Sequence, residues 1–194
     1  MAEPLDEKAA ALYDKTIAQG EQLLNALDFK GAISKFNKAI KLNPEDPRGY
    51  FNKAESSVGI PKLTILDISK LYEQAIELDA KKPFYYVRYG GFCLDNGLFR
   101  KAEACYREAA HIDPENAYLY YSEFAIEFFY NTKRLLENLE EESQKKVTTI
   151  SMYYLLRTLN LSKKKAEVLL KELDPVNPPF DVLEELEKKE FAED

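Results

Sequence analysis

Tryptophan is absent from this 194-residue chain, histidine occurs once, and there are only seven glycines and two cysteines. The single histidine, His111, has no cysteine or acidic partners at ligand spacing, so the pattern of a zinc site is missing. Scarce glycine is typical of an all-helical chain, because glycine is costly inside helices. No apolar run approaches the roughly 20 residues that a membrane-spanning helix needs.

The motifs of common enzyme sites are missing as well. The chain contains no phosphate-binding P-loop, no G-x-G-x-x-G dinucleotide motif and no G-x-S-x-G nucleophile motif. Its many glutamates are spread over helix faces, where solvation explains them. We therefore expect a protein that is not an enzyme and that carries no metal and no cofactor.

The composition is that of a globular protein, with 45% hydrophobic and 31% charged residues and a formal net charge of -7. Such acidity argues against a protein that grips nucleic acid with its whole surface. The N-terminus is acidic and lacks the apolar segment of a signal peptide. We therefore expect a cytoplasmic protein in which Cys93 and Cys105 are buried thiols rather than a disulfide.

Residues 86–114 contain two amphipathic helical patterns around a turn at residues 95–97. Apolar or small residues recur at helical spacing in both halves. In chain order they are Tyr86, Tyr89, Gly90 and Cys93, then Ala102, Tyr106 and Ala109. Gly97 is expected to adopt positive φ at a helix end, and Pro114 to close the second helix.

The same pattern occurs twice more towards the N-terminus. The closing positions are Pro44, Ala80 and Pro114, which are 36 and 34 residues apart. The two extra residues fall in the turn around Pro61, where insertions are tolerated. This pattern resembles the tetratricopeptide repeat (TPR), whose period is 34 and whose motif is W-x2-L-G-x2-Y, A-x3-F and a closing P. The residues predicted to pack the repeats are Gly20, Ala32, Phe36, Ala39, Pro44, Ala54, Tyr72, Ala75, Tyr86, Gly90, Ala102, Tyr106, Ala109 and Pro114.

The resemblance implies an all-α, right-handed superhelical solenoid of antiparallel helix pairs with a helical C-terminal extension. We expect the following segments: a helical lead-in at 1–12, repeats at 13–46, 47–82 and 83–116, degenerate or capping helices at 117–175, and a short C-terminal helix and tail at 176–194.

The resemblance also implies a function. In TPR proteins the first helices of successive repeats line a concave peptide-binding surface, so we expect a scaffold or adaptor that binds a peptide segment or helix of another protein. A co-chaperone-like or complex-assembly role would follow. Carried over by register, the surface contains Ile17, Glu21, Phe51, Asn52, Glu55, Phe84, Val87, Arg88, Gly91, Tyr118 and Tyr121.

One TPR subclass clamps the C-terminal carboxylate of heat-shock chaperones with two lysines, two asparagines and an arginine. Asn52 and Arg88 match two of these places. Ile17 and Phe84 stand where the lysines would be, and Glu21 replaces an asparagine. A carboxylate beside Glu21, without the lysines, would be repelled. We therefore expect an aromatic, partly apolar surface instead of this clamp.

A second reading concerns Ser162–Leu173, which resembles the second helix of a DNA-reading helix-turn-helix. Lys163, Lys164 and Lys165 lie in its first turn, where they oppose the helix dipole and could face an anion. The alternative function is therefore a nucleic-acid-associated regulator. Because the whole chain is acidic, we favour a helical cap here, a protein as partner, and neither nucleic acid nor membrane.

Overall fold

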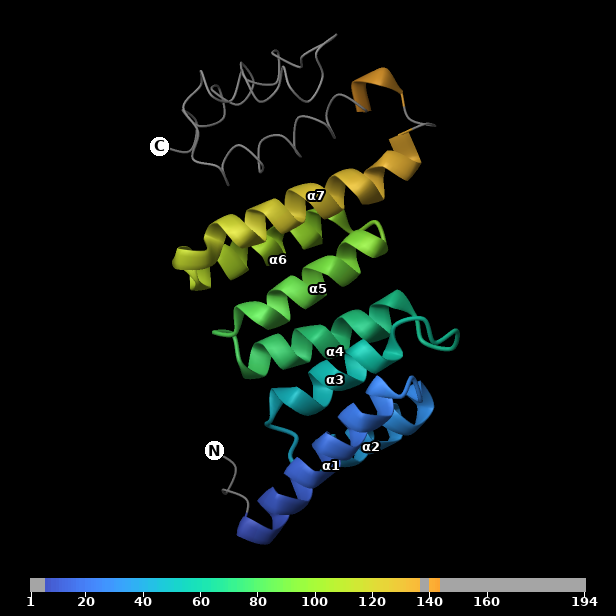
Figure 1. Cartoon of the computed structure of the whole chain (residues 1–194), viewed down its shortest axis with the longest axis vertical. Coiled ribbons are helices and arrows are strands. Elements are labelled where there is room, and N and C mark those ends of the chain that lie inside the picture. Colours follow the sequence, from blue (N-terminus) through green and yellow to red (C-terminus); the bar gives the residue numbers. More distant parts are fainter. Residues whose placement is uncertain (1–5, 137–139, 144–194) are drawn as a thin grey trace. The chain divides into compact units, whose positions relative to one another are not determined.

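A computed structural model describes residues 6–136 and 140–143, with only the backbone course for residues 129 and 132–136. Over residues 6–136 the chain is all-helical and contains no strand (Figure 1), which confirms the predicted all-α class. The elements are α1 (Glu7–Asn25), α2 (Phe29–Leu42), α3 (Pro47–Ser57), α4 (Ile65–Leu78), α5 (Pro83–Asp95), α6 (Phe99–Ile112), the 3-10 helix η1 (Pro114–Asn116) and α7 (Ala117–Leu136).

The chain divides into two compact units, residues 1–85 and residues 86–194. In the first unit α1 packs on α2, α2 on α3, and α3 on α4 (Figure 1). The core of the α1–α2 pair consists of Tyr13, Ile17, Ala32, Phe36 and Ala39. These residues recur every three or four positions along their helices, so each helix buries one stripe.

In the second unit α6 packs on α7. Aromatic rings fill the contact: Phe124 lies 5.5 Å from Tyr106 and 5.4 Å from Phe128, measured between ring centroids. Phe124 stands where the earlier repeats have Gly20, Ala54 and Gly90, and it is 1% exposed. α7 continues without a break from Ala117 to Leu136.

The helix ends follow their local sequence. Asp6, Asp28 and Asp46 each accept a backbone N–H at the start of a helix, and Pro47 occupies the first turn of α3. Gly97 has φ of 73°, as predicted. At the corresponding place after α1, Leu27 has φ of 60°. A leucine in the left-handed region is unusual, because its Cβ clashes with the following carbonyl.

α4 begins with a capping box, which was not predicted. The Thr64 hydroxyl oxygen accepts the Asp67 N–H at 3.1 Å, and an Asp67 carboxylate oxygen accepts the Thr64 N–H at 3.1 Å. This reciprocal pair satisfies two N–H groups that would otherwise lack a partner in the first turn. It starts α4 after the irregular segment at residues 58–63.

The predicted repeat-packing residues are buried, with three exceptions. Pro44 and Pro114 are exposed, since they lie just beyond the ends of α2 and α6. Tyr86 is half-buried, whereas its neighbours Tyr85 and Tyr89 on α5 are each 2% exposed. The repeat register thus identifies the helix and the turn that carry a buried ring. The tertiary packing decides which of the neighbouring tyrosine side chains is buried.

Cys93 and Cys105 are both buried and form no disulfide. None of the helices in the described ranges is long and apolar enough to cross a membrane. The predicted helix at Ser162–Leu173 and the predicted tail at 176–194 lie outside the described residues.

Candidate partner-binding site

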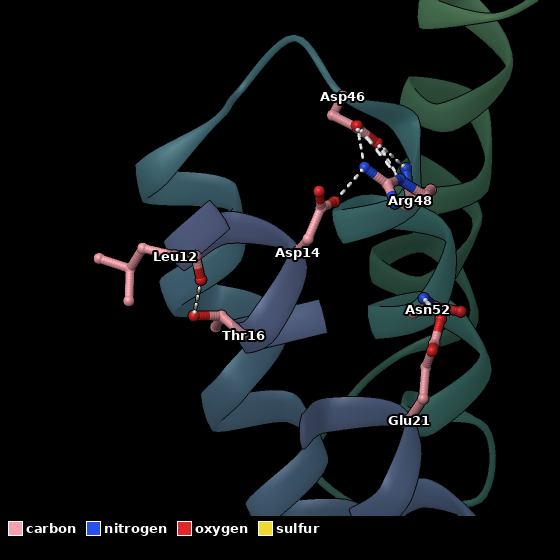
Figure 2. Close-up of polar contacts among 7 residues, drawn as sticks. All are labelled: Leu12, Asp14, Thr16, Glu21, Asp46, Arg48 and Asn52. Atoms are coloured by element: carbon pink, nitrogen blue, oxygen red, sulfur yellow. Dashed lines mark hydrogen bonds and ion pairs between the residues drawn. The ribbon is translucent and has the colours of Figure 1, made fainter. Parts of the chain in front are cut away.

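Four side chains from α1 and α3 lie beside one another on the first-helix surface of unit 1 (Figure 2). Asp14 and Glu21 are seven residues apart on α1, and Arg48 and Asn52 are four apart on α3, so each pair shares one helix face. We call Asp14, Glu21, Arg48 and Asn52 the α1–α3 seam. The seam contains two of the residues that the repeat register predicted for partner binding.

Asn52 and Glu21 connect the two helices directly. The Asn52 Nδ2 donates a hydrogen bond to Glu21 Oε1 at 3.1 Å (Figure 2). Glu21 is exposed and Asn52 is partly buried. Two residues 31 positions apart in sequence therefore meet where α1 and α3 lie side by side.

Arg48 uses its guanidinium within the protein. It donates to Asp46 Oδ2 at 2.8 Å and to Asp14 Oδ1 at 2.9 Å, so it joins the start of α3 to α1. Its guanidinium carbon lies 5.1 Å from the centroid of the Tyr13 ring, within the range of a cation–π contact. Burial tends to raise the pKa of Asp46, but the hydrogen bonds from Arg48 hold that pKa below its usual value.

Tyr13 and Thr16 are buried residues of α1 that flank Asp14 in the sequence. Burial raises the pKa of the Tyr13 hydroxyl, and the neighbouring Asp46 carboxylate raises it further. Thr16 stands at the place of the tryptophan in the TPR pattern and is 3% exposed. Its hydroxyl donates to the Leu12 carbonyl at 2.7 Å, which satisfies a polar group that would be costly to bury alone.

An aromatic cluster lies next to the seam in unit 1. Between ring centroids, Phe51 lies 5.3 Å from Phe84, 4.8 Å from Tyr85 and 6.0 Å from Tyr72. Phe51 is 7% exposed, whereas Phe84 is 51% exposed. Of the two predicted aromatic contact residues in this unit, Phe84 is therefore the one that solvent and a partner can reach.

Two other predicted surface residues of unit 1 are engaged in packing. Ile17 is 3% exposed and belongs to the α1–α2 core, because it lies one turn after Tyr13 on the face that contacts α2. Its side chain is therefore not part of an open surface, which corrects the expectation for this residue. Glu55 is partly buried and accepts a hydrogen bond from the Tyr72 hydroxyl at 2.5 Å.

The remaining predicted surface residues belong to the second unit. Arg88 is exposed on α5, while Val87 and Gly91 are half-buried. On α7, Tyr118 is 51% exposed and Tyr121 is half-buried. Their role in partner contact stays a prediction.

Unit 2 contains the same kind of hydrogen bond as unit 1, in which a buried tyrosine hydroxyl donates to a glutamate on a neighbouring helix. Tyr106 donates to Glu123 Oε1 at 3.0 Å, and burial, followed by the charge of Glu123, raises the Tyr106 pKa. Tyr120 donates to Asp113 at 2.8 Å, and burial together with this carboxylate raises the Tyr120 pKa to about 12. These bonds stabilise the helix pair and leave these tyrosines protonated at neutral pH.

Asp14, Asp46 and Arg48 are not among the residues predicted for this surface. A spacing signal was present, since Asp14 precedes Glu21 by seven residues and Arg48 precedes Asn52 by four. Both spacings bring side chains to one helix face. Charge pairing across the two helices, however, follows only from their packing.

The described residues offer no donor set for a metal. Within them, no three histidine, cysteine, aspartate or glutamate side chains are grouped closely enough to hold an ion. The contacts of the seam are hydrogen bonds and ion pairs on a partly exposed surface. Such an arrangement is suited to recognition of another molecule.

Known proteins resemble this chain in sequence and in fold. No family model matches the chain. Small glutamine-rich tetratricopeptide repeat-containing protein 2 of Mycosarcoma maydis is 32% identical over 118 residues, which cover 60% of this chain and 32% of that protein. Hsp70-Hsp90 organizing protein 3 of Arabidopsis thaliana is 28% identical over 141 residues, which cover 70% of this chain and 23% of that protein. The matches thus span a third or less of these curated relatives.

Solved structures agree in fold. The structure of MamA matches with a TM-score of 0.59 at 16% identity, over 79% of this chain and 80% of that one. The TPR domain of Arabidopsis OM64 matches with a TM-score of 0.51 at 20% identity, over 58% of this chain and 93% of that domain. Hairpins that recur with small residues at their contacts define a helical-repeat protein. In sequence the chain is similar to a tetratricopeptide repeat protein, and in fold it is similar to solved tetratricopeptide repeat domains.

Proposed function

We propose that this chain is a protein-interaction scaffold that binds a peptide segment or helix of a partner protein on the first-helix surface of its repeats. The observation that carries the proposal is the contact between Asn52 and Glu21, which brings two first helices together at predicted partner-binding positions. Phe84, an exposed ring that packs on Phe51, supplies apolar area. Polar groups that fix orientation, together with an exposed aromatic ring, suit peptide recognition.

The proposal includes a role in complex assembly, of the kind that a co-chaperone performs in the cytoplasm. One relative is named as an organizing protein for Hsp70 and Hsp90, which supports this kind of role. The carboxylate-clamp mode is not part of the proposal. Ile17 is buried where a lysine would be needed, and Glu21 adds a negative charge. No catalytic step is proposed, because the surface consists of groups suited to binding.

Site-specific photo-crosslinking in the native lysate tests the proposal. A benzoylphenylalanine in place of Phe84 keeps an aromatic ring at an exposed position of the surface. The matched control places the same group at Lys38, an exposed position on the second helix α2. We expect a discrete protein adduct from the Phe84 position and none from the Lys38 position. Equal adducts from both positions, or none from either, would overturn the proposal.

A further inference from the structure

The α1–α3 seam, together with Asp46 at the N-cap of α3, carries more negative than positive charge. Asp14, Asp46 and Glu21 contribute three carboxylates, and Arg48 contributes the one guanidinium that contacts any of them in the described residues. Because Arg48 is bound by Asp46 and Asp14, its charge is already neutralised. Glu21 therefore has no cation beside it in the described part of the chain.

Glu21 also keeps most of its hydrogen-bonding capacity. Among the described residues its carboxylate accepts one hydrogen bond, from Asn52, while an ionised carboxylate has about four acceptor positions. Asn52 has turned a donor towards Glu21, so fewer donors face outward. Ala18 lies between Asp14 and Glu21 on the same helix face and is exposed. Its small side chain leaves both carboxylates open to an incoming group.

Lys53 is the basic residue that follows Asn52 on α3. It is partly buried, and burial lowers its pKa. It occupies the repeat position that Gln19 and Tyr89 occupy in the other repeats. Because it directly follows Asn52 in the sequence, it lies on a different face of α3 from the seam residues. Lys53 is therefore poorly placed to neutralise Glu21.

An aromatic ring completes the surface. Phe84 is 51% exposed and packs on Phe51, the residue that precedes Asn52 on α3. An aromatic face attracts cations and accepts the aliphatic stems of lysine and arginine. An exposed carboxylate without a cation is complementary to a basic side chain, and the exposed ring of Phe84 offers a separate contact for apolar residues of the same segment.

We propose that the α1–α3 seam recognises a partner segment that carries a lysine or arginine, with the cationic group at Glu21 and apolar neighbours on Phe84. The seam thereby selects against acidic segments and free C-terminal carboxylates. This inference rests on the proposed function of the same surface and adds the charge of the partner. Repulsion of acidic segments contributes to this selectivity as much as attraction of basic segments does.

Fluorescence anisotropy with defined peptides tests the inference. The probes are short fluorescein-labelled peptides with C-terminal amides that share apolar residues and differ in whether their polar positions hold lysine, glutamine or glutamate. We expect the lysine peptide to bind about two- to fivefold more tightly than the glutamine peptide, as exposed ion pairs allow. The glutamate peptide should bind least, and added salt should reduce the preference. The lysine peptide with a free carboxylate should bind more weakly than its amide.

Two variants with the same change of net charge distinguish an effect of the seam carboxylate from an effect of the overall charge of the protein. Glu21→Gln should remove the preference for lysine, so that the lysine and glutamine peptides bind with similar affinity. Glu77→Gln alters an exposed glutamate of α4 and should keep the preference. Equal losses in both variants would mean that net charge alone acts, which overturns the inference.

The peptides also separate this inference from the proposed function. Equal binding of all peptides, insensitive to Glu21→Gln, would overturn the cation preference while peptide binding itself remained. Suppose instead that no peptide binds although circular dichroism shows an intact helical fold, and that the Phe84 crosslinks are also absent. The proposed function would then be lost, and the inference with it.

Discussion

Gly90 on α5 lies directly against the ring of Tyr106 on α6. A Cβ placed on Gly90 would be 2.7 Å from Tyr106 Cε2. The ring cannot move away easily, since Tyr106 is 1% exposed and its hydroxyl is held by Glu123 at 3.0 Å. We expect Gly90→Ala to lower the free energy of unfolding by about 1–3 kcal/mol through overpacking.

The neighbouring glycine provides a matched control for this prediction. A Cβ on Gly91 would come no closer than 3.8 Å to any neighbour, the Tyr106 hydroxyl oxygen. Gly91→Ala should therefore be neutral or stabilise the helix by roughly 0.5–1 kcal/mol, because alanine loses less entropy there. Thermal and urea unfolding followed by circular dichroism measure both variants. Similar stabilities for the two would contradict the close contact.

Leu27 adopts a backbone conformation that leucine rarely takes. Its φ is 60°, its side chain is 72% exposed, and the corresponding residue seventy positions later is Gly97, with φ of 73°. Leu27→Gly should raise the free energy of unfolding by about 1 kcal/mol, because the left-handed strain disappears and little burial is lost. Gly97→Leu should lower it by a similar amount. Urea unfolding checks both, and a destabilised Leu27→Gly variant would refute the prediction.

The Asp46 carboxylate should make the stability of unit 1 depend on pH. Its pKa in the folded protein lies below the usual value, since hydrogen bonds from Arg48 outweigh the effect of burial. A lowered pKa means that the stabilisation is fully present above the unfolded pKa, about 3.9, and is lost as pH falls through the folded value.

Asp46→Asn should therefore lower the melting temperature at pH 7, and the difference from the unmodified protein should shrink as pH falls below about 4. Glu45→Gln, an exposed neighbour, serves as the control and should change the melting temperature little at either pH. Melting curves at a series of pH values measure these differences. A deficit in Asp46→Asn that persists unchanged at acid pH would speak against this charge as its source.

The Thr64–Asp67 capping box gives a prediction for the start of α4. Thr64→Ala removes the hydroxyl oxygen that accepts the Asp67 N–H and should cost about 0.5–2 kcal/mol. Thr64→Ser keeps the hydroxyl and should retain most of the stability. Hydrogen exchange of the amides in the first turn of α4 reports the effect locally. Equal exchange in the two variants would show that the cap does not stabilise this turn.

Much of the fold could be predicted from sequence because its signals are local. Asp28 and Asp46 begin helices, and Gly97 ends one, through bonds and angles that involve only a few neighbouring residues. The repeated A-x3-[FY]-x2-A spacing identifies the buried stripe of each second helix without knowledge of its neighbour. The left-handed turn at Leu27 was not predicted, since leucine has no local preference for it.

The candidate site depended on tertiary structure to a greater extent. Register alone put Ile17, Glu21, Phe51 and Asn52 on one surface, but packing buried the first and left Phe51 only 7% exposed. Arg48 is on the right face by its spacing, yet its choice of Asp14 and Asp46 required α1 to lie beside α3. Helical periodicity is a property of one segment, so the sequence by itself determined the helices, their ends and their apolar stripes. Which charges are neutralised and which stay open depends on distances between helices, and only the packed structure decided these.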